Sequence, residues 1–488
     1  MGSSDAAMHR PHGELTAVVD LGKTRSRLLV LGTDGALIHE RACESASIDS
    51  PLGYRALDTA RTQAWLRTAL ADLGAMAPAL RHIVVTTHGA AVAALRGGEL
   101  ACPVPDYEWE GFDESADDLA GEIDPFESTL SPRLPRGLNM GRQLDWLDRH
   151  PAQPLADVDT LLPYAQYWSW WLSGVAASEV SSLGCHTLLW APRAQAFSGW
   201  AQRRGWAARF APLRKAWEVL GPIRGELATE LGLPMDISVH VGVHDSNACL
   251  APYLRSWPRM TLVSTGTWVV VMAPGAPQRR LAAERDQLAN VSVRGGCVPT
   301  ARFMGGREVA RLCAGAAPGL ADLKRLGDLL ARGLQIIPAF ENQGGPFAAH
   351  AGEIRLDGRS WTLAQWKEQV PAADRATAAA CYAASMCAWL IDQLGGAGPV
   401  VLEGPFGSNA TIASCLQALL PGMEVLVSDD SIEGTARGGW LLTRWTRAAA
   451  TSPQVLPSHP CPPSLSTALA GHHRAWRAAL PAGACVEP

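Results

Sequence analysis

A pattern in which two short apolar runs flank a glycine-bearing turn occurs twice in this 488-residue sequence and constrains its fold more than any other feature. The first copy comprises the runs 15–20 and 28–31 around the turn 21–24, and the second comprises 260–264 and 268–272 around 265–267. Such runs around a glycine turn predict β-hairpins. Because one copy lies in each half of the chain, we expect two α/β halves that each open with a hairpin.

The length of the chain also predicts two domains, because a single hydrophobic core stops growing at roughly 250–300 residues. We assign residues 1–250 to an N-terminal α/β domain, 251–450 to a C-terminal α/β domain and 451–488 to a tail. Further apolar patterns predict strands at 83–87, 239–242 and 399–402 and helices at 57–73, 375–394, 434–445 and, within the tail, 464–480.

Composition limits the partners. Formal net charge is -5 and no block of Lys or Arg occurs, so a nucleic-acid partner has no electrostatic footprint and a small substrate is favoured. The eleven cysteines form no CxxC pair, which favours reduced, buried thiols. The first 15 residues lack the apolar run of a signal peptide, and the apolar segment 164–177 is too short to span a bilayer. We therefore expect a cytoplasmic protein with no membrane partner.

The first turn has the residues of a phosphate site without being a P-loop. A P-loop needs a glycine five residues before Gly22, where this chain has Ala17. A tight turn still directs the backbone N–H groups of Gly22 and Lys23 and the Thr24 hydroxyl toward an anion. Asp20 faces the same point, and its carboxylate suits Mg²⁺ either directly or through water. The alternative is an ordinary hairpin with a capping Asp.

The second turn strengthens the phosphate interpretation. Ser264, Thr265 and Thr267 place hydroxyls around Gly266, which again makes an anion site rich in hydrogen-bond donors. An ordinary two-residue hairpin is the alternative. Two such turns in two halves are what a nucleotide clamped between domains requires.

Four motifs together make the chain resemble the FGGY family of carbohydrate kinases, within the sugar kinase/heat-shock ATPase/actin superfamily. They are the turn after Asp20, THG at 87–89, GVHDSNA at 242–248 and STGTW at 264–268. Weaker matches follow in family order at 103–108, 138–146, 232–234, 290 and 344–347. The resemblance implies two actin-like (ribonuclease H-like) α/β domains around a cleft. It also implies a sugar-binding first domain, a nucleotide-binding second domain, and phosphorylation of a sugar hydroxyl by ATP with Mg²⁺.

Asp245 is the predicted general base. Phosphoryl transfer to a hydroxyl needs a carboxylate to accept the hydroxyl proton, and the family places its catalytic Asp in this context. Asp245 is also a predicted Mg²⁺ ligand, and His244 beside it is a predicted sugar contact. An N-cap for the helix that follows is the alternative, and the two roles are compatible.

The resemblance places the sugar beside His88 and Gly89 and beside the acids Asp106 and Glu108. Acids that accept sugar hydroxyls next to an aromatic ring are common parts of a carbohydrate site. The alternatives are a structural His and a solvated acidic loop. The aromatic run 164–171 is interpreted as core, with Gln166 as a pocket candidate, and the roles of Glu179 and residues 181–187 stay open.

The adenine end matches the family less closely. Gly404 and Asn409 are predicted nucleotide contacts, but Pro405 stands where the family has a second Gly and removes a backbone N–H. Gly305 and the following residues 306–308 are expected to approach the nucleotide. Residues 433–436 are interpreted as packing and helix capping. Lys23 is unusual for the family and would add positive charge beside the phosphates.

The residues of the HDSN and STGTW motifs resemble those of the family branch nearest the rhamnulose and fuculose kinases. This resemblance implies a ketose substrate. A deoxy-ketohexose, a pentulose or a tetrulose all fit, and a homodimer is left open. A catalytically silent sugar- or nucleotide-binding regulator is the alternative, against which Asp20, Asp245 and both turns argue. An ATPase without a sugar acceptor is a third reading, disfavoured by the His88-Gly89 and Asp106 elements.

Overall fold

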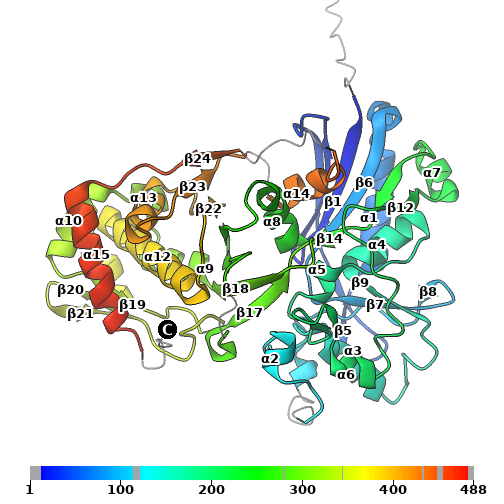
Figure 1. Cartoon of the computed structure of the whole chain (residues 1–488), viewed down its shortest axis with the longest axis horizontal. Helices are drawn as coiled ribbons and strands as arrows, with labels where there is room; N and C mark the ends of the chain where they lie inside the picture. The colour runs from blue at the N-terminus through cyan, green and yellow to red at the C-terminus, as the bar shows by residue number, and fades with distance from the viewer. Residues whose placement is uncertain are drawn as a thin grey trace, which may run out of the picture.

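The computed structural model describes residues 13–113, 121–277, 281–342, 344–430, 434–447 and 454–481. They form two halves that lie side by side, each built on a seven-stranded sheet with helices packed against it (Figure 1). The first half contains the N-terminal sheet and a region of short strands and helices, and the second half contains most of the chain after residue 260. The prediction of two α/β halves is confirmed.

The first sheet has its apolar strand β1 at the centre, and every residue of β1 is buried. The strand order is β12-β13-β6-β1-β2-β3, with β14 paired to β6. Strand β1 is antiparallel to β2 and parallel to β6, and β6 is parallel to β13 and β14. The strands are β1 (Leu15–Leu21), β2 (Arg25–Leu31), β3 (Leu37–Glu44), β6 (Leu80–Thr87), β12 (Val219–Pro222), β13 (Ser238–His240) and β14 (Val243–His244).

The second sheet repeats this arrangement, with the order β17-β18-β16-β15-β22-β23-β24. Strand β15 is antiparallel to β16 and parallel to β22, as β1 is to β2 and β6. The strands are β15 (Thr261–Thr265), β16 (Val269–Met272), β17 (Gln287–Val291), β18 (Cys297–Phe303), β22 (Val400–Glu403), β23 (Val425–Ser428) and β24 (Val455–Pro457). Both predicted hairpins are therefore present.

Short strands and 3₁₀ helices fill the connections. The short strands are β4 (Ser47–Asp49), β5 (Arg55–Leu57), β7 (Val92–Arg96), β8 (Glu99–Leu100), β9 (Thr160–Pro163), β10 (Trp190–Ala191), β11 (Ala196–Phe197), β19 (Gln335–Ile337), β20 (Glu353–Leu356) and β21 (Arg359–Trp361). The 3₁₀ helices are η1 (Gly74–Ala79), η2 (Glu110–Asp113), η3 (Ala283–Arg285) and η4 (Pro318–Leu320).

The helices pack on both halves. Those of the first part of the chain are α1 (Thr59–Ala71), α2 (Phe126–Thr129), α3 (Met140–Arg149), α4 (Tyr164–Ser173), α5 (Val180–Leu183), α6 (Gly199–Arg203), α7 (Gly225–Leu231) and α8 (Asp245–Ser256). The later ones are α9 (Gly305–Cys313), α10 (Leu323–Ala331), α11 (Leu363–Gln369), α12 (Ala372–Leu394), α13 (Ala410–Leu419), α14 (Gly434–Leu442) and α15 (Pro463–Ala478). The aromatic run in α4 is largely buried against β6, as expected for core.

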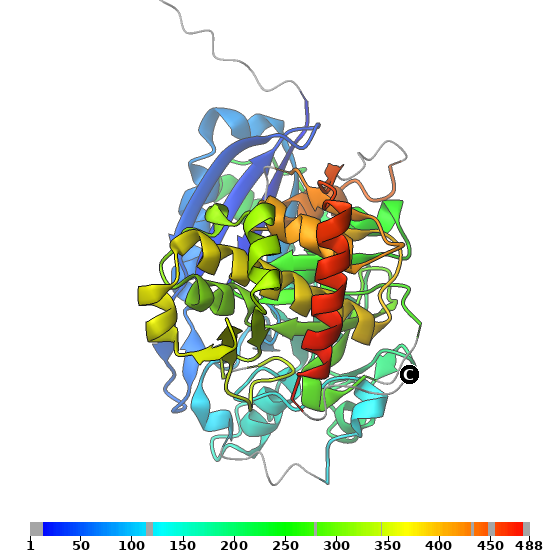
Figure 2. The same cartoon turned by 90° about the vertical axis from the view of Figure 1, so that its left-hand side faces the viewer.

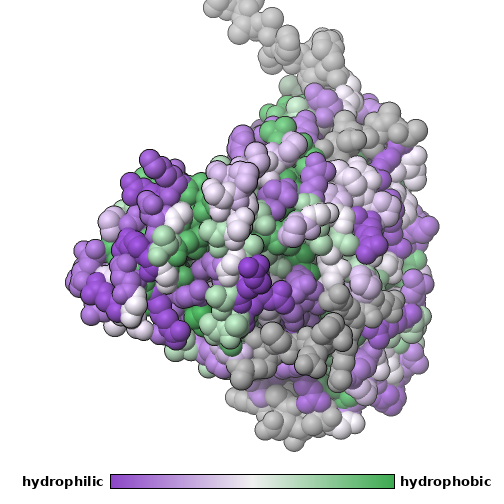
Figure 3. Space-filling view, turned by 60° about the vertical axis from the view of Figure 1, so that its left-hand side comes forward, coloured by the Kyte–Doolittle hydropathy of each residue, from purple (hydrophilic) through white to green (hydrophobic). Residues whose placement is uncertain are grey.

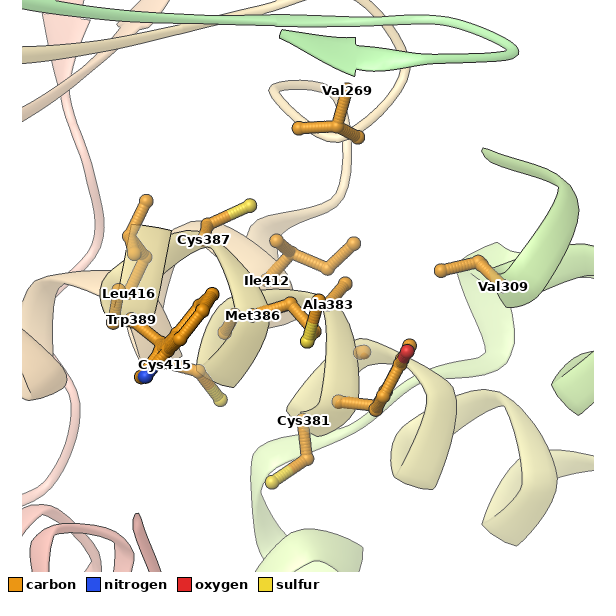
Figure 4. Close-up of a cluster of buried hydrophobic side chains, with 14 of the residues drawn as sticks. Val269, Val309, Cys381, Ala383, Met386, Cys387, Trp389, Ile412, Cys415 and Leu416 are labelled. Atoms are coloured by element: carbon orange, nitrogen blue, oxygen red, sulfur yellow. The ribbon is translucent and has the colours of Figure 1, made fainter. Parts of the chain in front are cut away.

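The long helix α12 forms the centre of the second half's core. Its side chains pack with those of α13 and with Val269 and Val309 (Figure 4). Cys381, Cys387 and Cys415 lie in this apolar cluster, where burial raises the pKa of each thiol. All ten cysteines in the described ranges are free, as the sequence predicts, and Cys485 lies outside those ranges.

Helices α8 and α14 join the two halves. α14 comes from the C-terminal part of the chain but packs against β1, β6 and α8 of the first half (Figure 1). Its close approach to α8 requires glycine, because a Cβ at Gly438 would overlap the Ala248 carbonyl. Trp440 Nε1 also donates to Gly32 O at 2.9 Å. We propose that the domain boundary lies within α8, near the predicted residue 250.

Part of the predicted tail belongs to the second half. β24 pairs antiparallel with β23, and α15 packs against α10 and α13 on the outer side (Figure 2). Leu469 and Trp476 of α15 are buried in the core. The predicted helix is thus present, whereas 451–453 and 482–488 lie outside the described residues.

Surface hydropathy and helix length are the features by which a bilayer-spanning segment would be recognised. On the face shown in Figure 3, hydrophilic residues cover much of the second half and hydrophobic residues gather toward the junction between the halves. Within the described ranges, no helix combines the length and the apolar character needed to cross a membrane.

Candidate active site

The predicted sugar and base residues meet because their strands are parallel. Leu21 of β1 and His244 of β14 both lie opposite Thr87 of β6, so the residues after these strands share one edge of the sheet. A cavity of about 340 Å³ opens at this edge. It is lined by His88, Gly89, Ala90, Tyr107, Glu108, Arg136, Leu138, His186, His244, Asp245, Trp268, Arg302, Met304 and Arg307. We call it the sugar cavity.

Asp245 lies in the sugar cavity as the first residue of α8, and the N-cap position itself belongs to His244. Its Oδ1 accepts hydrogen bonds from the backbone N of Ser246 at 2.5 Å and from the Ser246 hydroxyl at 3.2 Å. The side chain is 33% exposed, so a substrate can reach it. A carboxylate in the first turn is also stabilised by the helix dipole.

His244 is held in one orientation beside Asp245. Asn247 Nδ2 donates to His244 Nδ1 at 3.2 Å, so the ring proton is assigned to Nε2. Nε2 lies 3.1 Å from Asp245 Oδ1 and 3.2 Å from Cys185 Sγ. Burial lowers the pKa of His244 to about 4, so the ring is neutral near pH 7. His244 therefore orients the Asp245 carboxylate as a neutral hydrogen-bond donor.

Gly89 leaves room for this arrangement. A Cβ at Gly89 would lie 2.9 Å from His244 Nε2 and 3.2 Å from Cys185 Sγ. Contacts this short would push His244 away from Asp245. Gly89, the last residue of the predicted THG motif, is therefore required by packing against His244.

His88 is buried between two aromatic rings, with centroids 5.4 Å from Tyr107 and 5.2 Å from Tyr164. Its Nδ1 lies 2.8 Å from Gly89 O and donates to it, which leaves Nε2 as an acceptor. Burial lowers the pKa of His88. A neutral ring that lines the cavity with an acceptor nitrogen can receive a sugar hydroxyl.

Lys23, from the first turn, bonds to the acidic loop. Its Nζ lies 2.5 Å from Asp106 Oδ2 and 3.4 Å from Glu108 Oε2. Ser47 Oγ also donates to Asp106 Oδ2 at 2.6 Å. Burial acts to raise the pKa of Asp106, but the hydrogen bonds from Lys23 and Ser47 outweigh it and lower the pKa.

Of the two predicted sugar-binding acids, Glu108 lines the cavity and Asp106 lies behind it. Glu108 has a side chain that is 56% exposed. Asp106 Oδ1 accepts the backbone N of Glu108 at 3.0 Å and so fixes the loop that carries it. Asp106 thus supports the cavity wall through Lys23, Ser47 and Glu108. Gln166, also a pocket candidate, is buried and donates to Val241 O instead.

Several cavity residues had no sequence signal. Arg302 lies 3.0 Å from Asp286 Oδ2 and stacks over the Trp268 ring at 4.9 Å. Arg136 lies 2.8 Å from Glu110 Oε1. Asp286 and Glu110 are distant in sequence from their partners, so only the fold reveals these pairs. His186 falls in the segment whose role was open, and burial and nearby Arg302 lower its pKa to about 3.

Asp20 and Asp245 are the predicted Mg²⁺ ligands. Asp20 Oδ2 accepts from Arg27 at 2.7 Å and Oδ1 accepts from Thr86 at 3.0 Å. Burial raises the pKa of Asp20 to about 6 against the effect of Arg27, and the charge of Asp245 adds to the rise. The described residues contain no group of three or more His, Cys, Asp or Glu arranged for a metal. Mg²⁺ is usually held by one or two carboxylates plus phosphates and water, so Asp20 and Asp245, whose charges interact, fit such a site.

A second cavity of about 400 Å³ lies on the other side of the second turn. It is lined by Gly266, Thr267, Gly306, Arg307, Val309, Ala310, Pro318, Pro405, Phe406, Asn409 and Ile412. We call it the nucleotide cavity. Its lining is mostly apolar with donors from the turn at one end, which suits a base and a phosphate chain.

The other predicted nucleotide residues build the frame of this cavity. Thr265 Oγ1 donates to Glu403 O at 2.5 Å and accepts from Phe406 N at 3.1 Å. Gly404 has φ +80°, and a Cβ there would overlap the Thr265 carbonyl. Ser264 lies in β15 beside Thr265, and Gly305 is buried against Val269 and Phe303. These residues join the second turn to the loop after β22.

Asn409 and Pro405 lie at the predicted adenine end of this cavity. Asn409 lines the nucleotide cavity, while its Oδ1 caps α13 by accepting from Thr411 N and Ile412 N at 3.1 Å each. Pro405 gives this wall an apolar ring where the family has a backbone donor. Glu433, which the sequence assigned to packing or capping, lies outside the described residues.

The first turn does not line the nucleotide cavity. Gly22 N donates to Arg25 O at 3.1 Å, Thr24 is exposed, and Lys23 bonds to Asp106. Nucleotide contacts by Gly22, Lys23 and Thr24 therefore stay predictions.

Comparison with known proteins places this geometry in a family. Residues 258–452 match the C-terminal domain of the FGGY carbohydrate kinases. A carbohydrate kinase from Novosphingobium aromaticivorans is similar in structure, with 34% identity, a TM-score of 0.84, and coverage of 96% of this chain and 98% of that one. No curated protein sequence matches the chain.

More distant structures share the fold. A xylulose kinase from Rhodospirillum rubrum has 18% identity and a TM-score of 0.75, with coverage of 95% of this chain and 98% of that one. A glycerol kinase from Plasmodium falciparum, solved with ADP, has 10% identity and a TM-score of 0.70, with 94% and 93% covered. The chain belongs to the FGGY family of carbohydrate kinases. It is an ATP-dependent carbohydrate kinase with two actin-like domains, as the motifs predicted.

Proposed function

We propose that this kinase transfers the terminal phosphoryl group of ATP to a hydroxyl of a small ketose, with Asp245 as the general base. The observation that carries the proposal is that Asp245 lines a cavity that shares the lining residue Arg307 with the nucleotide cavity. A deoxy-ketohexose, a pentulose or a tetrulose fits the proposal, as the resemblance of the motifs to rhamnulose and fuculose kinases implies.

The sugar would be held by neutral and charged groups together. His88 Nε2 accepts one hydroxyl, and the Glu108 carboxylate, which lines the same cavity, accepts another. Trp268, held under Arg302, offers an apolar face to the sugar ring or chain. Two accepting groups and one apolar face are a usual basis for carbohydrate selection.

In the reaction, Asp245 accepts the proton of the attacking hydroxyl as its oxygen bonds to the γ-phosphorus. The bond from that phosphorus to the β-phosphate bridge oxygen breaks, and ADP leaves with the electron pair. His244 holds Oδ1 of Asp245, so the carboxylate does not have to reorient during transfer. Asp245 and Asp20 would hold Mg²⁺, directly or through water, and the ion would supply positive charge beside the phosphates.

We also propose that the two halves close on both substrates, because exclusion of water prevents hydrolysis of ATP. The Gly266 and Thr267 backbone and hydroxyl would bind phosphate, and the cavity by Pro405 and Asn409 would bind adenine. A cytoplasmic location, where ATP is supplied, follows from this role.

A substrate panel tests the proposal. Release of ADP is measured by a coupled assay with the full chain, MgATP and a set of ketoses, aldoses, sugar acids and polyols. ADP release stimulated by a ketose supports the proposed class. Turnover with a sugar acid or polyol alone would replace the ketose with that class. Sugar binding without turnover would indicate a silent regulator, and sugar-independent turnover an ATPase.

A further inference from the structure

Arg307 lies at the boundary between the two cavities. It is the third residue of α9, directly after Gly306. Of the described residues that line the sugar cavity or the nucleotide cavity, Arg307 is the one that lines both. A side chain in this position faces the path that the phosphoryl group takes from ATP to the sugar.

The backbone beneath Arg307 is fixed on both sides. Gly306 N donates to Thr267 O at 3.2 Å, and a Cβ at Gly306 would overlap the Gly266 carbonyl, so α9 begins in direct contact with the second turn. Glu308 is buried and accepts the backbone N of Phe340 at 3.0 Å and of Glu341 at 3.2 Å. Arg307 therefore extends from a rigid base.

Arg307 differs from the other cations near the cavities in that its charge is not paired with an acidic side chain in the described part of the chain. Lys23 pairs with Asp106, Arg136 with Glu110 and Arg302 with Asp286. Arg307 is exposed and makes neither an ion pair nor a hydrogen bond with any residue in the described ranges. Its positive charge is thus available to a ligand.

A group at this boundary carries negative charge during the proposed reaction. The transferred phosphoryl group keeps charge on three oxygens, and a preorganised cation beside it stabilises the transition state. A guanidinium suits this task because its planar N–H groups bind two phosphate oxygens at once.

We propose that Arg307 is a catalytic residue that binds the γ-phosphoryl group of ATP and follows it onto the sugar. This inference rests on the proposed function. The phosphorus gains its bond to the sugar oxygen and loses its bond to the β-phosphate oxygen while Arg307 remains protonated and donates hydrogen bonds. The hydroxyl proton goes to Asp245.

Binding of two nucleotides tests the proposal without any sugar. MgADP and the non-hydrolysable ATP analogue Mg-AMPPNP are titrated calorimetrically into the wild type, Arg307→Ala and Arg307→Lys. We expect Arg307→Ala to weaken Mg-AMPPNP binding at least about 10-fold and MgADP binding less than about 3-fold, because only the former carries a γ-phosphate. Equal losses, no loss, or a wild type that binds neither nucleotide would overturn the proposal.

Arg311→Ala is the matched control. It removes the same charge one turn later on α9, where Arg311 bonds to Phe340 O at 2.7 Å and Glu341 at 2.8 Å outside both cavities. We expect it to leave the ratio of the two nucleotide affinities unchanged. A shift in that ratio equal to that of Arg307→Ala would assign the effect to general charge and overturn the proposal.

Kinetics with the sugar found in the panel provide the second readout. We expect Arg307→Ala to lower kcat about 100-fold or more, with partial recovery by added guanidinium and by Arg307→Lys. A kcat within about 3-fold of the wild type contradicts the catalytic role. If the wild type phosphorylates no sugar, the proposed function fails, while the nucleotide titration still decides whether Arg307 reads the γ-phosphate.

Discussion

The two glycine turns follow the same kind of strand but differ in what they contact. The turn after β1 directs Lys23 onto Asp106 and Glu108 on the sugar side. The turn after β15 places Gly266 and Thr267 in the nucleotide cavity and Trp268 in the sugar cavity. The first turn thus supports the wall of one cavity, whereas the second turn and Trp268 after it contribute to both cavities.

This difference shows that the local sequence pattern determines that a hairpin forms, whereas the segments packed against each turn determine what the turn contacts. Each turn has a glycine, hydroxyls and buried flanking strands, so local sequence does not distinguish them. The helix that packs on the turn does. α9 begins against Gly266, and the loop after β22 is tied to Thr265. The predictions below separate the two turns experimentally.

Among the variants that compare the two turns, Gly306→Ala in the second turn's contact with α9 is expected to have the largest effect. The new methyl group would overlap the Gly266 carbonyl, and forced contacts of this kind cost about 1–3 kcal/mol. We expect ATP affinity to fall about 10- to 100-fold and sugar affinity to change less, as measured by calorimetric titration of each ligand. Gly327→Ala is the control, because its Cβ would have no neighbour closer than 3.9 Å and it lies within α10. Comparable loss of ATP affinity in both variants would show that the contact between α9 and the second turn is not needed for ATP binding.

A smaller effect is expected from Lys23→Met, which changes the first turn. Loss of the 2.5 Å bond to Asp106 leaves a buried carboxylate without its cation and loosens the loop that carries Glu108. We expect the KM for the sugar to rise about 10-fold, consistent with the loss of a charged hydrogen bond, and the KM for ATP to stay within about 3-fold. Lys324→Met on the exposed side of α10 is the control. A rise confined to the KM for ATP would show that Lys23 contacts phosphate and would remove the contrast between the turns.

The smallest effect on substrate KM values is expected from Glu179→Gln, at a buried position in the segment that leads to Cys185 and His186. Glu179 Oε2 accepts Ser181 N at 2.9 Å and Ser182 N at 3.1 Å, and Oε1 is buried with no hydrogen-bond partner in the described ranges. Burial raises the pKa of Glu179 to about 7. Because the folded pKa exceeds the unfolded one, ionisation costs stability as pH rises from about 4.5 to about 7.

Gln cannot ionise, so the stability of Glu179→Gln relative to the wild type should rise by about 1–3 kcal/mol from pH 5 to pH 8. Urea unfolding at the two pH values measures this change. The KM values for both substrates should stay unchanged, since Glu179 lines neither cavity. A stability difference independent of pH would mean that Glu179 is ionised throughout this range.

Much of the fold was predictable because its signal is local. Asp20 lies in a short apolar strand, and His88 and Asp245 each directly follow a short strand. Parallel pairing then brings their ends to one edge of the sheet. The assignment to a carbohydrate kinase family followed from the order of the motifs at these strand ends.

The rest of the site depends on contacts between distant residues. Lys23 meets Asp106 across 83 positions, and Thr265 meets Glu403 across 138. Arg302 lines the sugar cavity only because Trp268 and Asp286 hold its side chain. No local pattern separates these residues from ordinary surface charges. The contact of α14 with the first sheet was also not predictable, because it joins segments that are far apart in the sequence.

The central claim is that Asp245 accepts the proton of a sugar hydroxyl, and Asp245→Asn measures it most directly. The variant keeps the side-chain shape and one oxygen for Ser246 N but is no longer a base. We predict that kcat at saturating sugar and MgATP falls about 1000-fold while the affinity for MgADP stays within about 3-fold. A kcat within about 10-fold of the wild type would contradict the account.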